Sequence, residues 1–144
     1  MKRNAIIPLT CLLAAALAAI LGAAEAPWVA PARAAAKKNP LPSTSAALEA
    51  GKKVFEKECL SCHGPSGKGD GPKSAQLKVP PHDLSAPQIT GQSDGALFWK
   101  LTTGKNPMPK FDELLTEEQR WQVIHYMRSF TAPAAVAKTS TELP

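Results

Sequence analysis

The sequence predicts a small all-α domain of three to five helices, and three observations support that prediction. Three segments carry apolar residues at helical spacing. Each of these segments has residues that commonly cap a helix at one of its ends. The stretch between the first two, residues 64–92, is rich in glycine and proline, which indicates turns and irregular loop. A loop of that length inside a compact domain usually surrounds a functional site.

The first predicted helix begins near Ser45, a residue type that serves well as an N-cap. Placing successive residues about 100° apart gives one apolar stripe, formed by Leu48, Gly51, Phe55, Cys59 and Cys62. Both cysteines therefore continue the buried face of this helix. Gly51 lowers the helix propensity in the middle of the stripe, and we expect another helix to approach closely there.

Two further helices are predicted in the second half of the chain. One starts at Ser93 or Asp94 and stops at Gly104. The other starts with a capping box at residues 116–119, where Thr is followed three positions later by Gln. Its apolar face should pack on the first helix and consists of Val123, Tyr126, Met127 and Phe130.

Both ends of the 144-residue chain are expected to lie outside the folded domain. Residues 1–36 have a basic start, an apolar run and small residues after it, which is typical of a secretory signal peptide. Cleavage fits after Ala36, and a second possible site follows Ala26; an uncleaved signal would remain as a membrane anchor. Residues 37–44 are predicted to be a linker and residues 131–144 a flexible tail. The domain is thus predicted at residues 45–130, in a periplasmic protein.

Charge and composition exclude some classes of function. Without the leader, 14 basic and 11 acidic residues remain, and no basic stripe is interleaved with aromatic residues, so nucleic-acid binding is not expected. We find no nucleophile–base pair or paired carboxylates on a recognisable motif, and predict that the protein is not an enzyme. Because residues 45–130 are few for a stable hydrophobic core, we expect a cofactor to help fill the interior.

The residues Cys59-Leu60-Ser61-Cys62-His63 have the spacing of a covalent haem c attachment site. On a helical turn, positions i, i+3 and i+4 share one face. Both thiols can then reach the two vinyl groups of one haem while the His63 imidazole lies beneath the iron. Export supports this interpretation, because such attachment belongs to an oxidising compartment.

A redox-active disulfide and a structural zinc site are two other interpretations of these cysteines. A thioredoxin-like disulfide would need a βαβ context, which the sequence lacks. A structural zinc site would need four ligands, and the remaining candidates are only His82 and His125, without a second cysteine pair. One covalently bound haem c is therefore the favoured cofactor.

The iron of such a haem takes a sixth ligand or keeps an open site, and this separates electron carriers from sensors and catalysts. Met108 lies between Pro107 and Pro109 in a rigid loop, so we predict that it is the ligand. Met127, at helical spacing, is predicted to be a packing residue.

Three other side chains near the predicted site leave alternatives open. His82 could bond a haem propionate, replace Met108, or lie in a solvated loop, which is the default for such a residue. Trp99 could line the haem pocket or belong to the core. His125 is predicted to lie on the surface.

These residues resemble the class I c-type cytochromes, and among them the small bacterial single-haem domains. The resemblance covers residues 48–130 and is carried by the haem motif, by Gly69-Asp70-Gly71-Pro72, by Met108-Pro109 and by residues 121–128. It implies a helical fold around one haem, with the first and last helices crossing near Gly51 and Tyr126. It also implies that Met108 is the sixth ligand and that the Pro72 carbonyl accepts a hydrogen bond from His63 Nδ1.

The function that the resemblance implies is one-electron transfer between redox protein partners, with His63 and Met108 as the two iron ligands. The alternatives are a haem subunit of a periplasmic dehydrogenase or oxidase complex, and a ligand-binding cytochrome with an open iron site. A monomer or a subunit of a larger redox complex is expected. Lysines could steer acidic partners, and they are frequent around the haem-bearing segments, at positions 52, 53, 57, 68, 73, 78, 100, 105 and 110.

Overall fold

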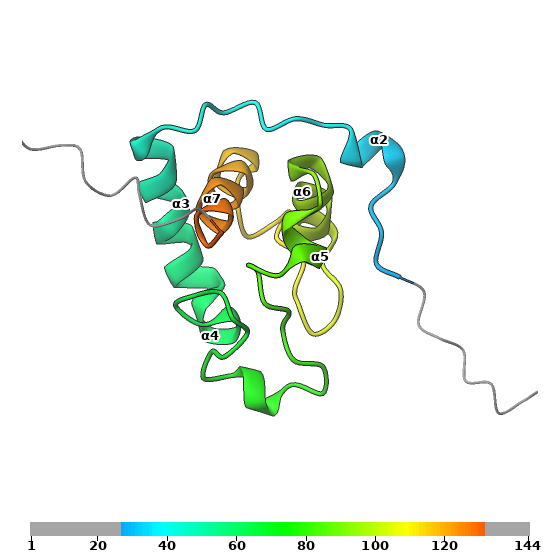
Figure 1. Ribbon diagram of the computed structural model, residues 1–144, viewed down its shortest axis with the longest axis vertical. Helices are drawn as coiled ribbons and strands as arrows, with labels where there is room; N and C mark the ends of the chain where they lie inside the picture. Colours follow the sequence, from blue (N-terminus) through cyan, green and yellow to red (C-terminus); the bar gives the residue numbers. More distant parts are fainter. Residues whose placement is uncertain (1–26, 132–144) are drawn as a thin grey trace, which may run out of the picture.

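The computed structural model describes residues 27–131, and in that part of the chain it contains helices and loops but no β-strand (Figure 1). The predicted all-α class is therefore confirmed. The helices are α2 (Ala32–Ala35), α3 (Ser45–Glu58), α4 (Leu60–His63), a 3₁₀ turn (Ser74–Gln76), α5 (Pro87–Thr90), α6 (Asp94–Thr103) and α7 (Glu117–Ser129). Residues 1–26 of the predicted leader and residues 132–144 of the predicted tail lie outside the described residues. None of the described helices is long and apolar enough to cross a membrane.

The helix starts follow the capping residues closely. The hydroxyl of Thr44, one residue before the predicted cap, accepts a hydrogen bond from the Ala47 N–H at 3.1 Å and caps α3. Ser93 caps α6, and the predicted capping box of α7 is formed on both sides by Thr116 and Gln119. Side-chain oxygens at these positions satisfy N–H groups that a helix end leaves without partners.

Helices α3 and α7 cross in close contact at Gly51 (Figure 1). A Cβ atom on Gly51 would lie 2.1 Å from the Gln122 carbonyl oxygen and 3.2 Å from Cβ of Tyr126, so only glycine allows this approach. Further along the crossing, the buried Phe55 ring packs against Tyr126 and Phe130, with centroids 5.3 and 5.2 Å away. The predicted crossing near Gly51 and Tyr126 is confirmed.

Gly51→Ala is expected to destabilise the fold by about 2 kcal/mol, because overpacking against a backbone carbonyl outweighs the gain of about 1 kcal/mol in helix propensity. Denaturant unfolding of the two proteins measures this difference. Gly91→Ala is the matched control, because the added Cβ would meet only the Pro87 carbonyl oxygen, at 3.0 Å. Equal effects of the two substitutions would contradict the close crossing.

Helix α7 buries more of its surface than its predicted apolar face suggests. It lies between α3 and α6, and both contact it (Figure 1). Val123 and Ile124 are fully buried, and Trp121 stacks on Phe98 of α6 at a centroid distance of 4.0 Å. Because α7 has a helix on either side, its buried face also includes Trp121 and Ile124, which are not part of the predicted apolar face.

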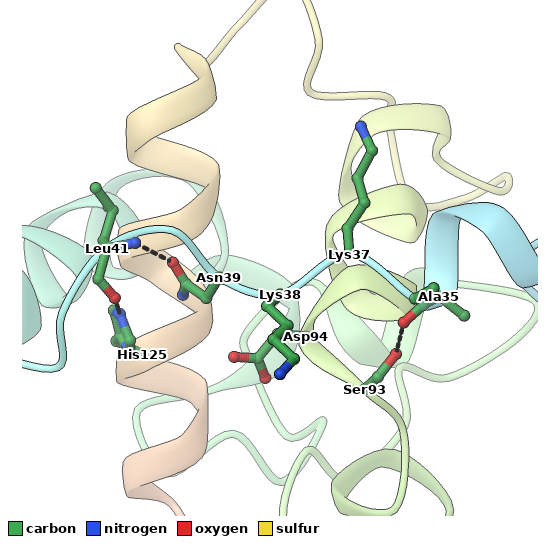
Figure 2. Close-up of a pocket in the computed structure, with 9 residues that line it drawn as sticks. Ala35, Lys37, Lys38, Asn39, Leu41, Ser93, Asp94 and His125 are labelled. Carbon is green, nitrogen blue, oxygen red and sulfur yellow. Dashed lines mark hydrogen bonds between the residues drawn. The ribbon is translucent and has the colours of Figure 1, made fainter.

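Residues 27–44, which we call the strap, pack along the domain (Figure 1); they comprise the end of the predicted leader, residues 27–36, and the predicted linker, residues 37–44. The strap runs from α2 across the ends of α6 and α7 to the start of α3 (Figure 1). Asn39 donates from its side chain to the Trp121 carbonyl at 3.1 Å, and His125 Nε2 lies 3.0 Å from the Leu41 carbonyl (Figure 2). Because carbonyls of the strap and of α7 find partners across this seam, residues 37–44 belong to the folded unit.

Candidate haem-binding site

The predicted site residues come together around one cavity of about 370 Å³. Cys59, Cys62 and His63 line it from the corner between α3 and α4, and Met108 lines it from the loop after α6. Most of the remaining lining is apolar and includes Phe55, Leu77, Val79, Leu84, Ile89, Leu97, Leu101, Phe111 and Met127. Residues of the glycine-rich stretch 64–92 form part of this wall, so the expectation that this loop surrounds the site is met.

Cys59 ends α3 and starts the next helical turn. Its N–H donates to the Phe55 carbonyl at 2.8 Å, while its own carbonyl accepts from the N–H groups of Cys62 and His63 at 3.1 and 2.9 Å. This turn gives the three side chains the i, i+3, i+4 arrangement that the sequence predicted. Cys59 is buried, whereas Cys62 and His63 are half-buried and border the cavity.

The two cysteines are not joined by a disulfide. Burial, followed by the charges of Glu58 and Cys62, raises the pKa of the Cys59 thiol to about 12. Redox-active and nucleophilic cysteines need the opposite, a lowered pKa in an electropositive setting. Among the described residues, no group of three or more His, Cys, Asp and Glu side chains could hold a metal ion. The site therefore does not support the thioredoxin-like and zinc alternatives.

The ring of His63 lacks the predicted hydrogen bond to Pro72. Its Nδ1 is buried and has no hydrogen-bond partner, while Pro72 is exposed and does not line the cavity. The backbone around Pro72 is instead tied to the haem motif, because Gly71 and Lys73 donate to the Cys62 and Ser61 carbonyls at 3.1 and 2.8 Å. This correction leaves one nitrogen of the His63 imidazole buried and unbonded.

The backbone of His82 lies close to the His63 ring. Burial lowers the pKa of His63 below its ordinary value, and a hydrogen bond with the backbone of His82 opposes this shift. The approach is possible because Gly69, at φ +79°, has no side chain: a Cβ there would lie 2.2 Å from the Pro81 carbonyl oxygen. Lowering of the pKa favours a neutral imidazole, the form that binds a metal.

The loop that carries Met108 is closed by backbone hydrogen bonds. Lys105 and Met108 pair through both of their N–H groups at 3.1 and 2.8 Å, with a cis peptide bond between Asn106 and Pro107 inside the turn. The buried Arg120 donates from Nη1 to the carbonyls of Phe111 and Leu115 at 3.2 and 3.0 Å. These contacts hold the half-buried Met108 side chain against the core.

Arg120→Leu is expected to lower the free energy of unfolding by about 1–2 kcal/mol, because it removes the Nη1 donor from the Leu115 carbonyl, whereas the Phe111 carbonyl still accepts from the Leu115 N–H at 3.0 Å. Chemical denaturation measures this loss. Lys110→Gln is a control in the same segment, since Lys110 forms only exposed ion pairs with Asp112 and Glu113 and should matter little. A loss no larger than that of the control would contradict the role of Arg120.

The structure also shows whether the remaining candidate residues line the cavity. Met127 packs against the core as predicted, and it also lines the cavity. His82 is exposed but borders the cavity, Trp99 is half-exposed and lines no part of it, and His125 is half-buried beneath the strap. The sequence analysis missed Trp28, which lines the cavity although it falls within the predicted leader.

A second hollow, of about 520 Å³, lies where the strap crosses α6 and α7 (Figure 2). Ser93 donates to the Ala35 carbonyl at 2.6 Å there, and His125 pairs with the Leu41 carbonyl. We interpret it as the contact surface between the strap and α6 and α7, because Asn39, Ser93 and His125 already form hydrogen bonds between the two.

These observations fit a covalently attached haem. Two unpaired thiols lie one helical turn apart, a buried imidazole nitrogen lacks a partner, and Met108 borders the same apolar cavity. Gly71 lets the loop lie against the motif, since a Cβ there would be 2.6 Å from the Leu60 and Ser61 carbonyl oxygens. Fold and site together define a small class I c-type cytochrome domain.

Comparison with known proteins agrees with this class. The model of the family described as cytochrome c oxidase, cbb3-type, subunit III matches residues 46–127, and the chain belongs to this family. Membership of this family implies a haem c cofactor and a role in electron transfer.

The similarity to individual relatives spans only part of the length of each relative. The cytochrome c subunit of the cytochrome bc1 complex of Mycobacterium tuberculosis is 31% identical over 84 residues, which are 54% of this chain and 26% of the relative. The Mycobacterium leprae subunit is 33% identical over 64 residues, 44% of this chain and 18% of the relative. The chain thus spans about a quarter or less of these relatives.

A solved structure also resembles the domain. It belongs to the reducing HAO-like protein complex of Kuenenia stuttgartiensis and superimposes with a TM-score of 0.60 at 35% sequence identity. The match covers 65% of this chain and 47% of that chain. Fold and sequence similarity therefore agree over the cytochrome domain.

Proposed function

We propose that this protein transfers single electrons between redox proteins through one haem c, bound by Cys59, Cys62, His63 and Met108. The observation that carries the proposal is that these four side chains, from two separate parts of the sequence, border one apolar cavity. Haem supplies the one-electron chemistry when bound, and a His/Met ligand pair raises its reduction potential.

The chain's own residues would hold and insulate the cofactor. Cys59 and Cys62 would anchor its edge through thioether bonds, and His63 and Met108 would be the protein ligands of the iron. With both of these residues bound to the iron, the proposal includes no catalytic role for the protein. The apolar wall would exclude water, which tunes the potential.

The proposed location is the periplasm, supported by the signal-like residues 1–36. Surface lysines support steering of an acidic partner only in part. Four of the nine lysines near the haem-bearing segments lie within 4.0 Å of a carboxylate oxygen, namely Lys52, Lys57, Lys68 and Lys110. Lys100 and Lys105 line the cavity itself, so their charges lie nearest to the proposed haem.

Two measurements on the purified full chain test the proposal. Its intact mass should exceed the polypeptide mass by one haem, and a redox titration should follow a single one-electron curve. A mass without haem, or two separate redox steps, would contradict it.

A second candidate is a haem subunit of a larger redox complex. It is favoured by the relatives, which are subunits of a bc1 complex and a chain of an HAO-like complex. Purification of the tagged protein at low ionic strength from its own cells distinguishes the two candidates. A stoichiometric catalytic subunit in the same peak would support the second, whereas a monomer that exchanges electrons with several acceptors would support the first.

A further inference from the structure

The strap contributes to the cavity although it lies outside the family match. That match begins at residue 46, whereas Pro27 and Trp28 are among the residues that line the cavity. The strap is thus an addition to the part of the chain that the family shares, and it reaches the place where the cofactor would bind.

Several contacts fix the course of the strap on α6 and α7. Ser93, the N-cap of α6, donates to the Ala35 carbonyl at 2.6 Å (Figure 2). Gly95 allows α2 to lie directly on α6, since a Cβ there would be 2.4 Å from the carbonyl oxygens of Ala34 and Lys37. Ala30 is buried next to Trp28. Residues 34–37 of the strap are therefore held against α6 through their backbone carbonyls.

Trp28 meets α6 at its cavity side. The Lys100 ammonium lies 5.1 Å from the centroid of the Trp28 ring, within the range of a cation–π interaction, and both residues line the cavity. Trp28 is half-buried while its neighbour Val29 is 69% exposed, so the indole turns inward and the Val29 side chain does not.

We propose that Trp28 is a further haem-contact residue, with which the strap covers the cavity beside Lys100 and limits the access of water and small ligands to the haem. This inference rests on the proposed function, because it needs a haem in the cavity. Removing the indole would let water reach the cofactor and stabilise the more highly charged ferric state.

The position of signal cleavage decides whether the mature protein contains Trp28. Cleavage after Ala36 would remove Trp28, Ala30 and all of α2. A mature protein that uses the strap must therefore retain residue 28. The intact mass of the exported wild-type protein identifies its first residue. A mature chain that contains Trp28 supports the proposal, and one that starts at Lys37 overturns it.

Variants test the contact itself. Trp28→Ala, purified as the haem-loaded full chain, should shift the ferric–ferrous equilibrium toward ferric by up to about tenfold, which is about 59 mV for a one-electron couple. In the Met108→Leu background, where the iron is expected to be open, added imidazole should also bind several times faster to the Trp28→Ala variant. Trp28→Phe should restore most of both properties. Trp99→Ala is the matched control, because Trp99 is also half-exposed but lines no part of the cavity.

The outcomes separate this inference from the proposed function. Wild-type protein without covalent haem would refute the proposed function, and the mass measurement would still show whether the strap is kept. Haem-loaded Trp28→Ala with the potential and imidazole kinetics of Trp99→Ala would refute the inference alone. If Trp28→Ala does not fold, the mass of the mature chain decides the question.

Discussion

Replacing both Cys59 and Cys62 by alanine is expected to abolish covalent haem attachment completely. The two thiols are unpaired, lie on one helical turn and border the cavity, so they are the groups of the site that could form thioether bonds. Acid–acetone extraction followed by the pyridine haemochrome spectrum measures the haem that stays with the protein. Loss of the anchor should also leave the small core less stable, since a cofactor would fill the cavity.

Ser61→Ala is the control for that substitution. Ser61 lies between the cysteines, and its hydroxyl lies 3.9 Å from the Cys62 sulfur. We expect this variant to keep its haem, because the serine hydroxyl takes no part in the thioether bonds that attach the haem. Haem that resists extraction from the double-cysteine variant would contradict the assignment of the motif.

Met108→Leu is expected to keep the haem attached and to open the iron. Leucine has nearly the same volume as methionine but no sulfur ligand, so the fold should survive. The methionine absorption band should vanish, imidazole and CO should bind, and the reduction potential should fall by more than about 59 mV, a tenfold change in equilibrium. Optical spectra and a redox titration measure these changes.

Met127→Leu is the matched control, because Met127 lines the same cavity and packs against the same core. It should retain the methionine band and bind no added ligand. The reverse result, with the band lost in Met127→Leu and kept in Met108→Leu, would show that the helical methionine is the ligand.

The helices were predictable because local signals agree with the packing. Capping side chains at Ser93 and Thr116 mark two helix starts, and Gly51 marks a close crossing. The haem motif was predictable for the same reason, since its geometry is contained in one helical turn. Met108 reached the same cavity through a short loop flanked by prolines.

The strap could not be predicted, because its signals are ambiguous. Small residues such as Ala34 and Ala35 look like a cleavage region, yet their backbone carbonyls lie against Gly95 of α6. The partner of the His63 ring was also not accessible from sequence. It depends on how residues 69–82 fold over the motif, which no local pattern specifies.

Arg120 is another residue that the sequence did not reveal. An arginine near the start of a helix is normally exposed, but here its guanidinium is buried beneath the loop that follows Met108 and bonds two of its carbonyls. Such a role follows from tertiary packing, because its partners are carbonyls that look alike in any sequence.

The central claim is that Cys59, Cys62, His63 and Met108 bind one haem c as a six-coordinate centre. An optical spectrum of the purified full chain, oxidised and then reduced with dithionite, tests it most directly, together with the pyridine haemochrome. We predict the spectrum of a covalent haem c, with the weak band at the red end of the visible range that reports methionine ligation. Covalent haem without that band would contradict the role of Met108, and a chain without haem would contradict the claim as a whole.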